Sequence, residues 1–426
     1  MRLILQFSSN EAMAKYLASH DNGTDGAIHV EATTFRRVHE LSILPVLVLE
    51  FSADIMDTSK IDSMFAPESS ILCVEPDTTL YLSTNAASTI LDVDSINNSI
   101  YGPFHGESIK IAIVDSGIDI THPDLERCIV DKHVFLLKDG ISAEIPSSDT
   151  GHGTAIAGII RGSGKQSTGK FKGIAPGVDL LDYIAFNGSG KGFLSDVLAS
   201  LDFAAKSNVK MICMAFSSLP SVKISKIFEN YLDILANTRD IVLCAGTGNF
   251  GPERGTIGMP GCFDSVLTTG STTRSFKVAP FSGRGYDGLK KPDFCLPGEK
   301  ITSLNVIDSF FKDSSLDENE YYARFSGNSI SVAILTGIVA MILDAQPALK
   351  PEDVKKLLLA SCNKIRKTAE ISAGRGLLSP VKAFVKLKQF YGFSKDYNKV
   401  LMETLVTTAS LTFFVIALSL MFASFI

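Results

Sequence analysis

Four apolar runs, each ending in small or polar residues, constrain the fold of this 426-residue chain more than any other feature. They read IKIAIVDSG, VDLLDYIAF, VKMICMAFSS and DIVLCAGTGN, and helical patterns such as LSDVLASLDFAAKS lie between them. Buried strands that alternate with helices are typical of a mostly parallel sheet covered by helices on both faces. Active groups in such sheets gather beyond the carboxyl ends of the strands. We therefore predict an α/β fold with its functional site at those ends.

Residues 1–83 have a different texture, which predicts a small α+β domain. The segments MRLILQF, VLVLEFSA, ILCVEP and TTLYL read as strands, and NEAMAKYLAS and TSKIDSMF have helical spacing. The order strand, helix, strand, strand, helix, strand is the split βαβ (ferredoxin-like) pattern of a two-layer domain. This pattern predicts a fold and carries no function by itself.

Residues 405–426 form a run of 22 residues without a charge. A helix of that length rises about 1.5 Å per residue and spans a hydrocarbon core of about 30 Å. Lysines precede the run, so the positive-inside rule leaves the bulk of the protein on the cytoplasmic face. They are Lys382, Lys386, Lys388, Lys395 and Lys399. We expect a basic linker over residues 393–404 and a single-pass transmembrane helix over residues 405–426. The alternative is a soluble protein whose last helix is buried.

Charge and cysteine content argue against several kinds of site. The formal net charge is −6 and no dense basic block occurs, which argues against a nucleic-acid partner. The seven cysteines are odd in number, scattered and without a CxxC pair. This pattern argues against a zinc site and a disulfide framework, and it suits a reducing compartment. The N-terminal apolar run is too short for a secretory signal. We predict no cofactor and no metal site.

Three residues with nucleophilic chemistry stand at the borders of buried elements. Asp115 ends the apolar run in IAIVDSGID, His152 lies between two glycines in DTGHGTAIAGII, and Ser329 precedes an apolar helix in FSGNSISVAI. Each alone is more often structural, as a turn former, a buried histidine and a helix cap. Together they supply a hydroxyl, a base that deprotonates it and a carboxylate that orients the base.

The order Asp, His, Ser and the motifs around it resemble the subtilisin-like serine proteases. The resemblance covers about residues 1–390, and its motifs stand as IAIVDSGID followed by HPDL, GHGTAIAGII, GTGNFGP, FSGRG, KPDFCLPG and GRGLLSPVKAF. It implies a peptidase domain over residues 84–392 that hydrolyses protein or peptide substrates. In the implied roles, Asp115 orients His152, His152 is the general base, Ser329 is the nucleophile, Asn249 and the Ser329 N–H form the oxyanion hole, and Ala215, Phe216 and Ser217 form the substrate-edge strand.

The resemblance also gives residues 1–83 a meaning. Their strand and helix order is similar to the family's propeptide, an intramolecular inhibitor that folds against the protease. Its last strand, ending YLS, would lie in the active-site cleft like a substrate, and the implied processing site is near Ser83 or Thr84. The segment after His152 lacks the Asn-rich calcium loop of secreted relatives, so no calcium site is expected there.

The chain departs from the family pattern near the nucleophile and at the substrate-edge strand. Where the family has Gly-Thr-Ser-Met and a Pro three residues later, this chain has Asn328 before Ser329, and Ala333 at the Pro position. Asn328 is placed to hydrogen-bond near Ser329 and hold its hydroxyl off line, and Phe216 is expected to add bulk beside the cleft. These two residues support an alternative function, a catalytically inactive binding module at the membrane. We expect Ser329 both to cap its helix and to attack.

Overall fold

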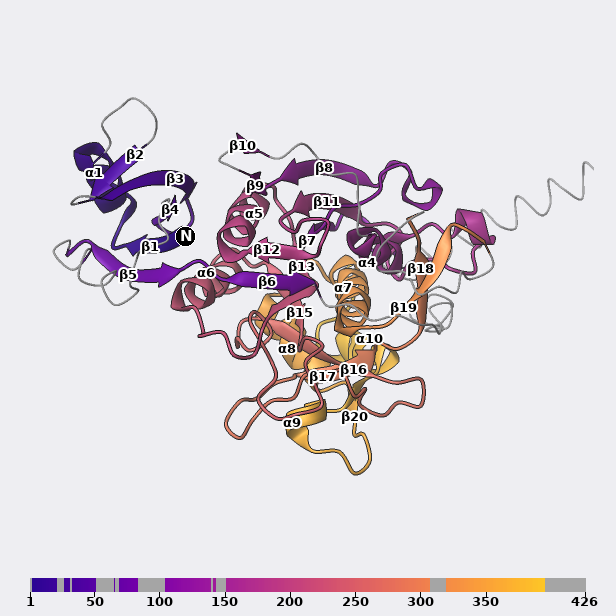
Figure 1. The fold of residues 1–426 in the computed structure, drawn as a ribbon. Coiled ribbons are helices and arrows are strands. Elements are labelled where there is room, and N and C mark those ends of the chain that lie inside the picture. Colours follow the sequence, from indigo (N-terminus) through magenta and orange to yellow (C-terminus); the bar gives the residue numbers. More distant parts are fainter. Residues whose placement is uncertain are drawn as a thin grey trace, which may run out of the picture.

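The computed structural model describes residues 2–20, 27–30, 33–50, 65, 69–82, 104–138, 141–142, 151–306 and 319–394. They form an N-terminal domain, indigo in Figure 1, and a larger α/β domain. Several predicted features lie outside the described residues. They are most of the helix TSKIDSMF, both residues of the implied processing site, most of the linker 393–404, and the whole transmembrane segment 405–426.

The N-terminal domain is an antiparallel sheet with a helix against one face. Its five strands follow the order β2-β3-β4-β1-β5. On the central strand β1, Leu3 and Leu5 pack with Met13 and Tyr16 of α1, because alternate residues of a strand share a face. The elements are β1 (Arg2–Phe7), α1 (Asn10–His20), β2 (Ala27–Val30), β3 (Thr33–Leu41), β4 (Val46–Glu50) and β5 (Ile71–Pro76).

The larger domain is built on a nine-stranded sheet of the order β20-β21-β17-β16-β15-β13-β7-β11-β8. All neighbouring strands run parallel except β20 and β21. The four apolar runs form four adjacent strands of its middle, β15, β13, β7 and β11, so the predicted parallel sheet is confirmed. The strands are β7 (Lys110–Asp115), β8 (Ile129–Val134), β11 (Asp179–Ile184), β13 (Met211–Met214), β15 (Val242–Gly246), β16 (Leu267–Thr272), β17 (Phe294–Pro297), β20 (Cys362–Asn363) and β21 (Leu377–Leu378).

Helices cover both faces of this sheet, as predicted. Ile111 and Ile113 of β7 face one apolar core, and Ala112 and Val114 face the other. The first core also holds residues of α4 (His152–Arg161), α7 (Asn328–Ala345), α8 (Pro351–Leu359) and α10 (Pro380–Phe390). The second holds residues of α5 (Leu194–Lys206), α6 (Lys226–Asn237) and the N-terminal sheet, which Figure 1 shows on that side.

One helix in the described part of the chain, α7, is long and apolar enough to cross a membrane. All of it is buried inside the protein, so it is the central core helix of the domain. The remaining short elements are η2 (Pro123–Leu125), β9 (Leu137–Lys138), β10 (Ile141–Ser142), η3 (Lys165–Ser167), β18 (Ile301–Leu304), β19 (Tyr322–Phe325) and α9 (Glu370–Ala373).

A three-stranded sheet joins the two domains. Its middle strand is β6 (Thr79–Leu82), which leaves the N-terminal domain and lies between β12 (Lys191–Phe193) and β14 (Phe216–Ser218) of the larger domain (Figure 1). Both pairings are antiparallel. The segment TTLYL is therefore not a strand of the N-terminal sheet, and its backbone is paired on both sides by the larger domain.

Candidate active site

Asp115 and His152 form the best-defined contact of the site. Asp115 is the last residue of β7, and His152 is the first residue of α4. The Nδ1 atom of His152 lies 2.8 Å from Oδ1 and 2.9 Å from Oδ2 of Asp115, and both side chains are buried. The Ser116 N–H also donates to Asp115 Oδ1, at 2.7 Å. A carboxylate so placed holds a proton on Nδ1 and leaves Nε2 to act as the base.

The two glycines that flank His152 allow α4 to begin against the loop that follows β7. Gly151 is the N-cap residue and has φ 69°, a left-handed conformation that favours glycine. A Cβ on Gly153 would lie 2.4 Å from the Gly117 carbonyl oxygen, so a side chain there would push the helix away. The sequence G-H-G therefore brings the imidazole within hydrogen-bond distance of Asp115.

Ser329 is the second residue of α7, whose N-cap is Gly327 with φ 149°. The prediction that Ser329 caps the helix is wrong, because the cap residue is a glycine without a side chain. The Ser329 hydroxyl instead donates to the Ala215 carbonyl oxygen at 2.9 Å. Its place in the first turn puts the side chain at the positive end of the helix dipole, where negative charge is stabilised. The helix α4, which carries His152, packs against both β7 and α7.

The two polar atoms of the Asn249 side chain, Oδ1 and Nδ2, differ in their hydrogen bonding. It follows β15, and its Oδ1 accepts the Asn328 backbone N–H at 2.8 Å. Its Nδ2 is buried and has no hydrogen-bond partner among the residues that the structure describes. A buried amide donor without a partner costs about 1–3 kcal/mol. Such a donor, fixed through its own oxygen, suits a transient oxyanion.

Asn328 does not take the orientation that its sequence position suggested. Its Oδ1 accepts the Gly248 N–H at 3.0 Å, and its Nδ2 donates to the Thr269 carbonyl at 3.0 Å and to Ser271 Oγ at 2.8 Å. The expectation that it holds the Ser329 hydroxyl off line is therefore wrong. The side chain ties the turn that precedes Asn249 to the neighbouring strand β16.

The sequence analysis did not recognise that Gly246 leaves room for the side chain of Asn328. A Cβ on Gly246 would lie 1.9 Å from Asn328 Oδ1, so the glycine at the end of β15 makes room for the asparagine. The two positions, 82 residues apart, are matched in size. A size match across that separation becomes visible only when the strand and the helix start lie side by side.

Residues 215–217, which the resemblance implied as a substrate-edge strand, lie at the start of β14, and their side chains are used differently from the expectation. Phe216 is fully buried, and its ring centroid is 4.9 Å from that of Phe186 in the core on the α5 and α6 side. Its bulk therefore supports the strand from the core. The Ser217 hydroxyl stands between two glycines: a Cβ would be 3.0 Å from it on Gly248 and 2.7 Å on Gly258. Strand β12, which pairs with the other side of β6, was not predicted.

A buried ion pair supports the loop that carries Asp115. Asp182 of β11 accepts the Ile118 N–H at 3.1 Å and lies 3.0 Å from the Lys132 ammonium. Lys132 Nζ also donates to the Ile118 carbonyl at 3.2 Å. Burial raises the pKa of Asp182 to about 6, and the ammonium of Lys132 opposes the rise. Together the pair holds both backbone groups of Ile118, three residues beyond Asp115.

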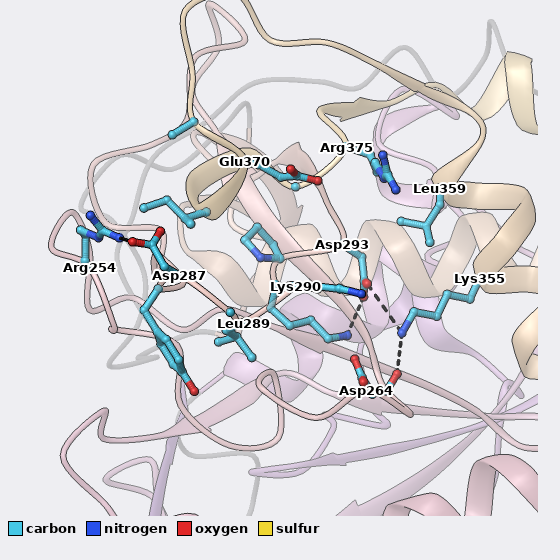
Figure 2. A pocket seen from close by; sticks show the side chains of 17 residues that line it. Arg254, Asp264, Asp287, Leu289, Lys290, Asp293, Lys355, Leu359, Glu370 and Arg375 are labelled. Atoms are coloured by element: carbon cyan, nitrogen blue, oxygen red, sulfur yellow. Dashed lines mark hydrogen bonds and ion pairs between the residues drawn. The ribbon is translucent and has the colours of Figure 1, made fainter.

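A separate cavity of about 790 Å³ lies beside α8 and α9 (Figure 2). Five of its charged side chains form ion pairs: Lys291 Nζ lies 2.7 Å and Lys355 Nζ 3.8 Å from the Asp293 carboxylate, and Arg254 pairs with Asp287 at 2.6 Å. Lys291 is fully buried, also donates to the Val266 carbonyl, and has its pKa lowered by burial. Lys291 and Asp293 of the KPDFCLPG motif, directly before β17, thus bond to the backbone at the start of β16. Within the described residues, no three His, Cys, Asp or Glu side chains are grouped to hold a metal ion.

Comparison with known proteins finds serine proteases. The subtilase family pattern matches residues 106–379. The chain is 32% identical over 276 residues to the serine protease AprX of Bacillus subtilis (strain 168), which covers 59% of this chain and 61% of that protein. It is 29% identical over 276 residues to a subtilisin of Bacillus sp. (strain TA39), covering 61% and 62%. It is 25% identical over 387 residues to alkaline elastase YaB of Bacillus sp. (strain YaB), covering 88% and 89%.

A solved structure shares the fold. Fervidolysin from Fervidobacterium pennivorans, a keratinolytic enzyme related to subtilisin, superposes with a TM-score of 0.70 at 19% identity. The superposition covers 90% of this chain and 60% of that one. The chain thus spans about three fifths of the length of fervidolysin and of the first two relatives.

Proposed function

The chain belongs to the subtilase family, and on this premise we propose that it is a serine endopeptidase that works through an acyl-enzyme. The observation that carries the proposal is the Asp115–His152 contact, with Ser329 at the start of the central helix. In this proposal Ser329 is the nucleophile, His152 the general base and acid, and Asp115 the group that orients His152 and stabilises its protonated form.

The proposed reaction has two halves. In the first, Ser329 Oγ adds to the scissile carbonyl carbon while His152 Nε2 takes the hydroxyl proton. The negative oxygen then accepts hydrogen bonds from Asn249 Nδ2 and the Ser329 N–H. When the C–N bond breaks, His152 gives its proton to the leaving amine. In the second half, water attacks the ester with His152 again as base, and the acid product leaves Ser329 as a hydroxyl.

The alternative of an inactive binding module loses its two supports. The Asn328 side chain hydrogen-bonds to Gly248, Thr269 and Ser271, so these bonds direct it away from the Ser329 hydroxyl. Phe216 is packed in the core. The Asp115–His152 contact and the buried Asn249 Nδ2, which has no partner in the described part of the chain, fit a catalytic site better than a module that only binds.

The proposal is tested by covalent labelling. A serine-directed fluorophosphonate probe should label the native protein and leave the Ser329→Ala variant unlabelled, with loss of peptide hydrolysis in step. Ser331→Ala is the matched control, since Ser331 lies on the same helix and bonds to Ser271 and the Leu296 carbonyl. Equal labelling of native and Ser329→Ala protein would count against the assignment.

We further propose that the N-terminal domain is an inhibitory propeptide. In support, β6 lies between β12 and β14 as an added strand, the way an extended peptide substrate binds. Leu82 pairs with Phe216, one residue after Ala215, whose carbonyl accepts the Ser329 hydroxyl. The proposed cleavage follows closely after Leu82, near Ser83 or Thr84.

Two carboxylates of the N-terminal domain support the same proposal. Asp77 accepts the Ser195 N–H at 2.9 Å and its hydroxyl at 2.5 Å, at the start of α5. Glu75 accepts the Lys226 N–H at 2.9 Å and bonds to Ser225 Oγ, at the start of α6. Both carboxylates accept backbone N–H groups that a helix N-terminus leaves without intrahelical partners. The match to alkaline elastase YaB covers 88% of this chain, which is more than the part that follows position 83, so it includes part of this domain.

We also propose that residues 405–426 anchor the protein to a membrane, with the catalytic domain on the cytoplasmic face. The support is the uncharged run and the lysines before it. Full-length protein should stay with membranes through a carbonate wash, and a chain that ends at residue 399 should be soluble and active. Aggregation or unfolding of the shortened chain would mean that the segment belongs to the core.

A further inference from the structure

The segment 381–391 concentrates exposed apolar side chains. The described residues hold twelve large hydrophobic side chains that are exposed, and four of them belong to these eleven positions. They are Val381 at 42%, Val385 at 40%, Phe390 at 63% and Tyr391 at 38% exposure. Single exposed hydrophobic residues are normal on a protein surface, but a cluster of them marks a contact surface.

The core does not need this outer face of α10. The inner face already packs through Ala383, Phe384 and Leu387, which are all buried. Phe384 stacks on Phe104 with ring centroids 5.9 Å apart. Val381 and Val385 are one helical turn apart, so they share a face of the helix. Both are exposed, which places this shared face away from the buried inner residues. The helix is therefore apolar on both sides, with only one side buried by the domain.

Lysines surround the outer valines. Lys382, Lys386 and Lys388 belong to the same helix, which contains no acidic residue. Lys386 Nζ lies 5.6 Å from the Phe390 ring centroid, and Lys382 donates to the Asn363 side chain. Asn363 is followed by three further exposed cations, Lys364, Arg366 and Lys367. On the acidic side, Asp353 accepts the Tyr391 hydroxyl at 3.4 Å.

Position along the chain identifies the occupant of this face. The last described residue, Ser394, is separated from the uncharged run 405–426 by ten residues. Ten extended residues reach at most about 35 Å. If the run spans a membrane, α10 stays close to the lipid surface, and valines flanked by lysines match the boundary between acyl chains and anionic headgroups.

We infer that the outer face of α10, made of Val381, Lys382, Val385, Lys386, Lys388 and Phe390, lies on an anionic membrane surface. The inference rests on the proposed membrane anchor. The valines and Phe390 enter the headgroup and acyl boundary, and the lysines pair with lipid phosphates and carboxylates. The contact holds the catalytic domain in one orientation on the membrane, where the linker alone would let it turn.

The chain contains no tryptophan, so one substitution creates a unique fluorescent probe. Full-length Val385→Trp protein is reconstituted into vesicles of phosphatidylcholine and phosphatidylserine with brominated acyl chains. We expect emission shifted to the blue and quenched severalfold relative to the same vesicles without bromine. The control is Tyr286→Trp, at a site 55% exposed beside the cavity of Figure 2, where emission should be water-like and unquenched.

A second arm tests the charges. Lys382→Glu with Lys386→Glu, added to Val385→Trp, should abolish most of the quenching, as should vesicles of phosphatidylcholine alone. The matched control is Lys172→Glu with Lys277→Glu, two exposed lysines outside this segment, which changes the net charge equally and should leave quenching intact. Equal quenching in neutral and anionic vesicles would overturn the anionic-lipid part of the inference.

The remaining outcomes separate this inference from the anchor. Protein that carbonate removes from the vesicles overturns the anchor and this inference with it. Protein that resists carbonate but shows water-like emission overturns the inference alone. Blue-shifted emission without bromine quenching also overturns it, because the face would then be covered by polypeptide, such as residues 395–426.

Discussion

The active centre and the junction between the two domains are built from different contacts. The active centre belongs to elements buried on all sides: Asp115 ends a core strand and Ser329 begins a core helix. The junction adds to its apolar contacts several carboxylates that bond backbone N–H groups across the two domains, such as Asp77 to Ser195 and Asp202 to Ile43. The core contacts around Asp115 and Ser329 form when the larger domain folds. We expect the contacts at the junction to form and break while both domains stay folded, as at an interface between two molecules.

Because the two regions are held by different contacts, we expect that substitutions can impair catalysis and docking of the N-terminal domain independently. Changes at the active centre should abolish catalysis and leave the N-terminal domain docked. Changes at the junction should loosen docking and leave catalysis intact. The predictions below examine this separation, beginning with the largest expected effect.

The largest effect is expected at the base. His152→Ala should lower kcat for a peptide substrate by about a millionfold, because the hydroxyl then has no group to take its proton. Docking of residues 1–83 should be unchanged, because strand β6 is held by backbone pairing with β12 and β14. Hydrolysis rates and co-purification of the two domains measure both effects. Activity within tenfold of native would contradict the role of His152.

Asn249→Leu should lower kcat by about a hundred- to a thousandfold, with KM nearly unchanged, because the Nδ2 contact strengthens only in the transition state. Leucine is close in size, and it also removes the acceptor for the Asn328 N–H. Steady-state kinetics on one peptide separate kcat from KM. A change confined to KM would assign Asn249 to ground-state binding instead.

Asn328→Ala should reduce kcat by about tenfold, since unpaired groups at Gly248 and Thr269 cost about 1–3 kcal/mol, and part of that loss appears as misplacement of Asn249. In the Asn249→Leu background the same change should have less than a twofold further effect on kcat. Thr336→Ala, a buried change further along α7, is the control for a purely structural loss. Additive losses of kcat in the double variant would mean that Asn328 acts independently of Asn249.

The smallest effect is a pH dependence of docking. Burial raises the pKa of Asp77 from 3.8 to about 6, and the bonds from Ser195 oppose the rise. The docked carboxyl therefore binds its proton more tightly than the free one, so docking strengthens as pH falls from about 7 towards 4 and is weakest above 6. A separate 1–83 peptide should bind the Ser329→Ala catalytic domain about tenfold more tightly at pH 5 than at pH 7.

The control for that measurement is Asp77→Asn, which should bind with little change between the two pH values. His39, which contacts Asp196 at 3.2 Å, is another titratable group at the junction. If the Asp77→Asn peptide still bound more tightly at pH 5 than at pH 7, the pH dependence of docking would not come from Asp77.

The sequence alone predicted the sheet, because apolar runs such as IKIAIVD alternate with helical patterns. It also predicted the edge of the sheet where Asp115 lies, because the carboxyl ends of parallel strands meet there. The pairing of Asp115 with His152 was expected from their residue types and from the resemblance to subtilisin-like proteases. The glycines around His152 also pointed to a close approach, which the contact of Gly153 with Gly117 explains.

What the sequence could not predict depends on neighbours far away along the chain. Asn328 was expected to disturb Ser329, because the residues that hold it, Gly248 and Thr269, lie in other elements. The residue pattern grouped the strand Thr79–Leu82 with the N-terminal sheet, because alternation predicts a strand but not its partners; only the family resemblance implied that it lies against the larger domain. Ser329 was read as a cap because serine is common there, whereas a glycine at φ 149° takes that place.

A comparison of intact masses tests whether Ser329 cuts its own chain just after strand β6. Native protein and the Ser329→Ala variant are purified in parallel, with Ser331→Ala as control. The native and control chains should each give two fragments that meet near Ser83 or Thr84, and the Ser329→Ala chain should stay whole. A native chain that stays whole yet hydrolyses peptides, or a Ser329→Ala chain cut at the same bond, would contradict cleavage by Ser329.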